Sequence, residues 1–148
     1  MNLNDEFVKK GFVLAGMMNI AGPLIFSSFL TNKIIPEMDP DVMSNFGLIQ
    51  IAVWGLIYIA MSQKYDQLKW LIGVFVIEKL IYSLNWTSWI LNNSITSVYE
   101  KDSMAGMFYT LYGINDWFFF LFFSVVFLKL LNQQNTRATP RTPNKLTQ

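Results

Sequence analysis

Four long apolar stretches, separated by short polar segments, constrain the fold of this chain more than any other feature of its sequence. They cover about residues 11–31, 44–62, 69–91 and 104–130. Each is close to the roughly 20 residues that an α-helix needs to cross about 30 Å of hydrocarbon. Their continuous apolarity differs from the alternating pattern of transmembrane β-strands. The sequence therefore predicts an all-α, multi-pass integral membrane protein, a four-helix antiparallel bundle with up-down-up-down topology.

The composition agrees with lipid as the solvent and excludes several classes of function. Of the 148 residues, 53% are hydrophobic and only 14% are charged, against about 25% charged in typical soluble proteins. The net charge of +1 gives no reason to expect binding to nucleic acid. The chain contains no Cys and no His, which excludes disulfides, thiolate chemistry, His-ligated metals and His-dependent catalysis. We therefore expect no metal and no cofactor. Any polar chemistry would have to use carboxylates, lysine, amides, hydroxyls or indoles, so a non-enzymatic function is favoured and an enzyme that uses the carboxylates stays open.

The placement of Lys and Arg predicts the orientation, because cytoplasmic loops of membrane proteins carry an excess of these residues. With an even number of spans, most of them fall on one side: Lys9, Lys10, Lys64, Lys69, Lys129, Arg137, Arg141 and Lys145. Only Lys33 and Lys101 fall on the other side. Both termini are therefore expected in the cytoplasm, and the pattern, together with the absence of Cys, fits a bacterial cytoplasmic (inner) membrane.

The polar segments divide the chain further. We expect one transmembrane domain over residues 1–131 and a disordered cytoplasmic tail over residues 132–148, because the tail is polar and rich in Thr, Pro, Asn and Gln. The segment 32–43, on the outer side, contains Pro36 and Pro40. It predicts an ordered turn region or a short interfacial segment.

Ionisable residues near the middle of two apolar stretches point to a buried polar centre. Glu78 and Lys79 lie in the third stretch, and Asn115 and Asp116 lie in the fourth. An ionised side chain at this depth costs about 2.5–3.5 kcal/mol, so these groups must be paired, neutralised or hydrated inside the bundle. Because adjacent residues lie about 100° apart around a helix, we expect that Glu78 and Lys79 do not meet each other.

Helical spacing extends this centre into a candidate site. Glu78, Tyr82 and Asn85 share one helical face, and Tyr112 and Asp116 share another. We predict a cleft that faces outward, floored by Glu78, Lys79 and Asp116. The full candidate set for a ligand or proton site is Glu78, Lys79, Asp116, Asn115, Asn19, Gln50, Asn85, Tyr82, Tyr112 and Trp54.

The sequence leaves the use of this centre open. One interpretation is binding of a small or lipid-like ligand, or passage of protons or solute, with membrane lipids and a homo-oligomer as partners. A second is an accessory or assembly subunit of a larger membrane complex. A third is purely structural: an ion pair between Lys79 and Asp116, with a neutral Glu78 bonded to an amide such as Asn19 or Gln50. An intramembrane aspartyl protease would need a second transmembrane Asp, which the sequence lacks.

Overall fold

The computed structural model describes the backbone of residues 4–138 and the side chains of residues 4–133. Within this range the chain forms helices and no strands, so the predicted all-α class is confirmed. The helices are α1 (Asp5–Phe26), α2 (Ile34–Met38), α3 (Asn45–Met61), α4 (Lys69–Asn92), α5 (Ile95–Lys101) and α6 (Ser103–Ala138). The four long ones, α1, α3, α4 and α6, fall on the four predicted stretches.

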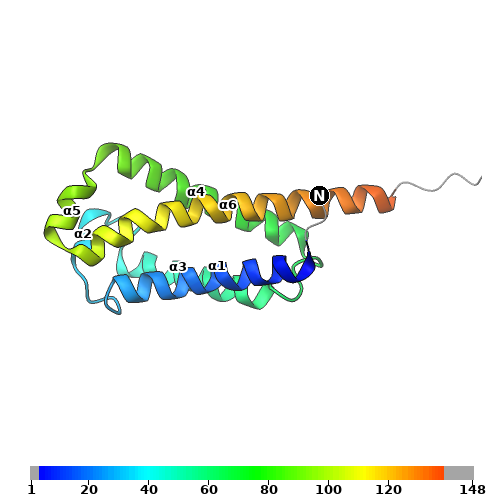
Figure 1. Ribbon diagram of the computed structural model, residues 1–148, viewed down its shortest axis with the longest axis horizontal. Coiled ribbons are helices and arrows are strands. Elements are labelled where there is room, and N and C mark those ends of the chain that lie inside the picture. The colour runs from blue at the N-terminus through cyan, green and yellow to red at the C-terminus, as the bar shows by residue number, and fades with distance from the viewer. Residues whose placement is uncertain (1–3, 139–148) are drawn as a thin grey trace, which may run out of the picture.

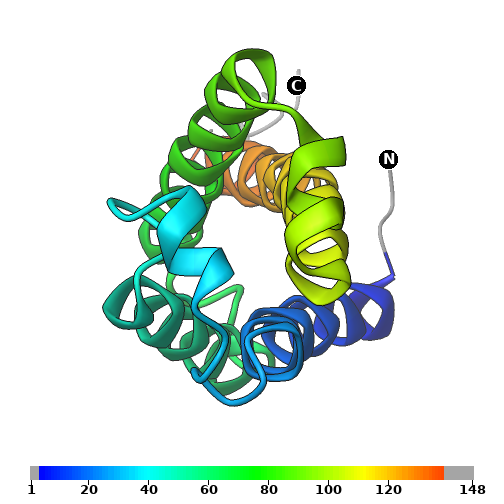
Figure 2. The same ribbon diagram turned by 90° about the vertical axis from the view of Figure 1, so that its left-hand side faces the viewer.

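The long helices run along one axis, and each is antiparallel to the next long helix in the chain (Figure 1). The short helices α2 and α5 lie together at one end, which we call the cap. Seen end-on, the long helices surround a common axis in the order α1, α3, α4, α6 (Figure 2). Helix α1 packs along α3, helix α4 packs along α6, and α6 also contacts α1.

The helix ends follow local capping signals and differ in detail from the predicted ends. Asn4 caps α1 because its side chain accepts a hydrogen bond from the Glu6 backbone N–H at 3.1 Å. The side chain of Ser44 caps α3 in the same way through Gly47. Helix α1 ends at Phe26, before residue 31, because the chain turns there with positive φ angles of 50°, 56° and 67° at residues 28–30.

Helix α6 is longer than expected. It continues to Ala138, past residue 130 and into the segment for which a disordered tail was predicted from residue 132. The first residues of that segment are thus helical, because they extend an existing helix and do not have to nucleate a new one. The remainder of the predicted tail, residues 139–148, lies outside the described residues.

By length and composition, one helix in the described part of the chain could cross a membrane. It is the 31-residue segment Ser103–Gln133 of α6, whereas the apolar helix α3 has only 17 residues. Helix α1 begins with two acidic and two basic residues, and α4 carries Glu78 and Lys79 at its middle. By these two measures the structure supports one candidate span and does not support the predicted four.

Two apolar cores hold the bundle together. The core nearer the cap, the cap-side core, includes Ile35, Met43, Leu48, Trp89, Val98 and Tyr109. The core at the opposite end, the tail-side core, includes Val8, Phe12, Tyr58, Phe75, Phe119 and Phe123. On α1, α4 and α6, the buried polar residues Asn19, Lys79 and Asp116 come between the residues that belong to the two cores. The structure therefore places a polar layer between two apolar ones.

Candidate functional site

The ammonium group of Lys79 is at the centre of the polar layer. It donates to Asp116 Oδ1 at 2.6 Å and to Asn19 Oδ1 at 3.0 Å. The side chain of Lys79 is only 1% exposed. Because Asn19, Lys79 and Asp116 come from α1, α4 and α6, this one amine connects three helices. The sequence-based expectation of a buried Lys79–Asp116 ion pair agrees with this geometry.

Glu78 completes the layer with a contact that the sequence did not predict. Its Oε2 accepts a hydrogen bond from the hydroxyl of Tyr58, and its Oε1 lies 3.8 Å from Lys79 Nζ. The expectation that Glu78 and Lys79 do not meet was wrong, because the flexible four-carbon stem of Lys79 lets the ammonium approach its neighbour. The expected amide partner, Asn19 or Gln50, is replaced by Tyr58.

Tyr58 belongs to the polar layer, although the sequence did not single it out as a candidate site residue. It lies one helical turn after Trp54 on α3 and is fully buried, and this i+4 spacing was the available signal. Its ring also lies 5.5 Å from Lys79 Nζ, within reach of a cation–π contact. We define the charge cluster as Asn19, Tyr58, Glu78, Lys79 and Asp116.

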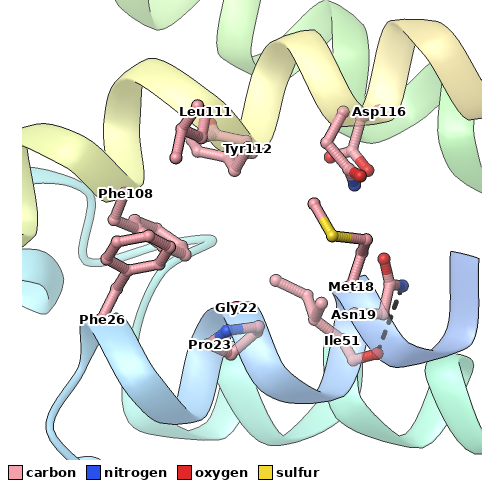
Figure 3. Close-up of a pocket in the computed structure, with 11 residues that line it drawn as sticks. Met18, Asn19, Gly22, Pro23, Phe26, Ile51, Phe108, Leu111, Tyr112 and Asp116 are labelled. Carbon is pink, nitrogen blue, oxygen red and sulfur yellow. Dashed lines mark hydrogen bonds between the residues drawn. The ribbon is translucent and has the colours of Figure 1, made fainter. Parts of the chain in front are cut away.

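A narrow pocket leads to this cluster from the side of the bundle. It has a volume of about 60 Å³ and lies between α1 and α6, with Ile51 of α3 in its wall. Figure 3 shows Asp116 and Asn19 at one end, and Phe26 and Phe108 at the other. The pocket is therefore apolar along its length and polar at one end.

The pocket opens toward the outer surface of the bundle. Met18 on α1 and Leu111 on α6 line it, and they are 44% and 47% exposed. Gly22 lines it as well, and a Cβ atom added there would meet no atom within 4 Å. Space for a ligand is thus present beside Gly22, in the seam between two helices.

The cap covers the end of the bundle where the cleft was expected to open. The hydroxyl of Tyr109 donates to the Ile35 carbonyl at 2.8 Å, and Trp89 Nε1 donates to the Met38 carbonyl at 3.0 Å. The Trp89 and Tyr109 rings stack with their centroids 4.2 Å apart. These contacts hold α2 over α4 and α6, so the pocket reaches the surface sideways and not along the bundle axis.

The structure brings together only part of the predicted site. Asn115 and Tyr112 line the pocket beside Asp116. Three other candidates, Gln50, Tyr82 and Asn85, line a separate groove of about 330 Å³ with residues of α3 and α4.

The remaining contacts of these candidates are structural. The amide of Asn85 donates to Asp39 Oδ2 at 3.2 Å. Trp54 packs edge-on against Phe75 at 6.3 Å and belongs to the surroundings of the tail-side core. Neither residue contacts the charge cluster through these interactions.

The chemistry available at the cluster is ionic and hydrogen-bonding. In the described residues, no group of three or more His, Cys, Asp or Glu side chains could hold a metal ion. The cluster offers two carboxylates, one ammonium, one amide and one phenol. Such a set can bind a polar or charged group, or hold a proton.

Comparison of this chain with protein-family models, with curated proteins and with solved structures finds no match in any of the three.

Proposed function

We propose that this chain is a four-span helical membrane protein of a bacterial inner membrane, with both termini in the cytoplasm. We propose further that it binds a small amphiphilic molecule in the pocket between α1 and α6. The observation that carries the proposal is a pocket with apolar walls that ends at the buried charge cluster. Known ligand sites also combine mostly apolar walls with a few convergent polar groups. Because the pocket holds only about 60 Å³, it would enclose the polar head and the adjoining part of such a molecule, and the rest of its chain would extend out of the side opening.

The distribution of polarity supports a membrane location. Large apolar side chains that are 41–61% exposed occur on all four long helices: Leu14, Met17, Val53, Leu56, Ile77, Ile81, Leu84, Ile114, Phe118 and Leu121. Charged side chains are meanwhile buried at the centre of the bundle. Soluble monomers rarely expose apolar surface of this extent, and lipid solvates it without penalty.

The helix lengths are compatible with four spans. At about 1.5 Å per residue, the 22 residues of α1 and the 24 of α4 extend about 33 and 36 Å. The 17 residues of α3 extend about 26 Å. A bilayer accommodates a helix that is a few ångströms short by local thinning, at a modest cost.

The position of the opening supports an amphiphile as the ligand. A pocket that opens sideways between two helices would face the hydrocarbon of a surrounding bilayer. A molecule could enter from lipid with its tail along Phe26 and Phe108 and place its polar end near Asp116. The hydroxyl of Tyr112, a lining residue, is buried, and it could contact the same polar end.

Two alternatives receive less support. In an accessory subunit the buried charges would pair with another protein, but Lys79 and Asp116 pair within one chain. Passage of protons or solute would need a polar path along the axis, but apolar cores cover the polar layer on both sides. A binding site therefore agrees better with the contacts of the cluster.

Native mass spectrometry of the protein released from lipid nanodiscs tests the proposal. We expect the wild type to retain an alkyl compound and Gly22→Leu, which fills the pocket, to lose it. Ala60→Leu places the same leucine side chain at an exposed position of α3 and should retain the compound. An empty wild type, or equal retention by Gly22→Leu, would refute the proposed function.

A further inference from the structure

The charge cluster is not electrically balanced. It contains two carboxylates, Glu78 and Asp116, which are each 6% exposed, and one ammonium, Lys79. With all three groups ionised, the cluster carries one excess negative charge. A net charge in an apolar interior is unfavourable unless another charge compensates it.

The contacts within the cluster leave part of this negative charge without a close partner. Lys79 makes its short contact with Asp116, at 2.6 Å, and is 3.8 Å from Glu78. Glu78 Oε1 is buried and has no hydrogen-bond partner among the described residues. The cluster therefore has the capacity to stabilise one additional positive charge.

The pocket presents this negative charge to its contents. Asp116 is part of the lining, together with Asn19 and Asn115, whose amides can each donate or accept a hydrogen bond. None of the residues that line the pocket is a Lys or an Arg, and Lys79 itself is not exposed to it. An anionic ligand group would thus meet a carboxylate and no cation, whereas a cationic group would meet a carboxylate directly.

One wall residue nearer the polar end also suits a cation. Tyr112 lines the pocket between Phe108 and Asp116 (Figure 3), and its ring stacks on that of Phe108 with centroids 5.3 Å apart. Aromatic faces attract alkylammonium groups through their quadrupoles, and this attraction increases when the cation is removed from water.

We propose that the ligand of the α1–α6 pocket is a lipophilic amine, an alkyl chain with a cationic ammonium head that compensates the excess negative charge of the cluster. This inference rests on the proposed function, since it specifies the charge of the amphiphile bound at the same pocket. It makes Glu78 a specificity-determining residue that acts through the charge of the cluster, although Glu78 itself does not line the pocket.

The test compares three probes of equal chain length that differ in head-group charge: dodecylamine, dodecan-1-ol and dodecanoate. Equilibrium binding of each radiolabelled probe is measured with the protein in zwitterionic nanodiscs at neutral pH, and empty nanodiscs give the lipid background. We expect dodecylamine to bind about tenfold more tightly than dodecan-1-ol, as one charge-assisted contact would provide, and dodecanoate to bind most weakly.

Glu78→Gln is the decisive variant. It removes the excess charge, keeps the Lys79–Asp116 contact and keeps an oxygen that can accept from Tyr58. We expect it to lose the preference for the amine, so that dodecylamine and dodecan-1-ol bind with equal affinity. Asp66→Asn is the matched control, because it removes one negative charge at an exposed loop position, and it should keep the preference for the amine.

The outcomes separate this inference from the proposed function. Equal binding of amine and alcohol by the wild type would overturn the inference and would indicate that a proton balances the cluster. Retention of the amine preference by Glu78→Gln would also overturn it. With either of these two results, loss of dodecan-1-ol binding in Gly22→Leu would still support the pocket as a binding site for an amphiphile. If Gly22→Leu bound all three probes like the wild type, the proposed function itself would fail.

Discussion

The ammonium of Lys79 lies 2.6 Å from the carboxylate of Asp116, and both side chains are almost completely buried. The contact connects α4 with α6 at the level of the polar layer. Removal of one partner from a buried ion pair leaves an uncompensated charge and typically costs about 3–5 kcal/mol. The stability of the bundle should therefore depend strongly on this pair.

We expect Lys79→Met to lower the free energy of unfolding by about 3–5 kcal/mol, because it leaves two buried carboxylates without their ammonium. Asp116→Asn should cost less, because Lys79 keeps the carboxylate of Glu78 at 3.8 Å. The double variant should lose less than the sum of the two, because the contact between the two side chains is lost in both single variants. Unfolding of the purified protein by denaturant in mild detergent gives the required values. Additive losses would show that the two side chains do not stabilise each other.

Two glycines of α1 should respond in opposite ways to the same substitution. A Cβ at Gly16 would lie 2.5 Å from the Gly55 carbonyl oxygen of α3, whereas a Cβ at Gly22 would meet nothing within 4 Å. We expect Gly16→Ala to destabilise the protein by about 1–3 kcal/mol through overpacking. Gly22→Ala should be neutral or stabilising by up to about 1 kcal/mol, because Ala favours helix. Thermal unfolding of both variants tests the expected contrast, and equal effects would contradict it.

The contact between the start of α1 and the α3–α4 loop should depend on pH. Asp5 pairs with Lys9 at 2.6 Å and accepts from the Tyr65 hydroxyl at 2.8 Å. The hydrogen bond from Lys9, and then that from Tyr65, lowers the pKa of Asp5 below its ordinary value. A lowered carboxyl pKa contributes stability that is present above the unfolded-state pKa and is lost as the pH falls through the folded-state pKa.

We therefore expect wild type to be more stable than Asp5→Asn at neutral pH, with a difference that disappears under acid conditions, below the ordinary pKa of an aspartate. The melting temperatures of the two proteins, measured across this pH range, check the expectation. Asp66→Asn serves as the control for loss of a nearby exposed carboxylate. A difference between wild type and Asp5→Asn that stayed constant with pH would argue against the ionic contact.

The chain has no Cys, so labelling of single Cys variants can test the membrane topology without background labelling of native cysteines. A membrane-impermeant maleimide should label Thr96→Cys, in α5, from outside intact cells. It should label Gln63→Cys, in the α3–α4 loop, only after the cells are permeabilised. Both positions are exposed in the structure.

Leu56→Cys distinguishes lipid from water on the outer surface of α3. Leu56 is 60% exposed, so a reagent in water would reach it readily in a soluble bundle. In a bilayer, hydrocarbon would cover this position, and we expect labelling only after denaturation in detergent. Labelling of Leu56→Cys in intact membranes at the rate of Gln63→Cys would contradict the four-span proposal.

The positions of the long helices could be predicted from sequence because they depend on local information. Continuous apolar runs indicated where the long helices form, whereas the caps at Asn4 and Ser44 became evident only in the structure. The inward position of Lys79 and Asp116 also followed from the cost of exposing charge to an apolar solvent. These conclusions needed no knowledge of which helix lies beside which.

Only the tertiary structure decided which polar residues of different helices contact one another. Helical periodicity gives the direction of a side chain around its own axis, but not the identity of the helix that it faces. That is why Glu78 meets Tyr58 and not an amide, and why Gln50 and Asn85 lie in a groove away from the cluster. The length of α6 beyond the predicted end also required the folded chain.

The sequence by itself thus determined an all-α chain with charged groups directed toward its interior. The tertiary structure decided that the resulting space opens sideways between α1 and α6, beneath a cap formed by α2 and α5. The physical reason is that helix formation and burial depend on residues close in sequence. A pocket depends on the gaps left when side chains of separate helices pack against each other.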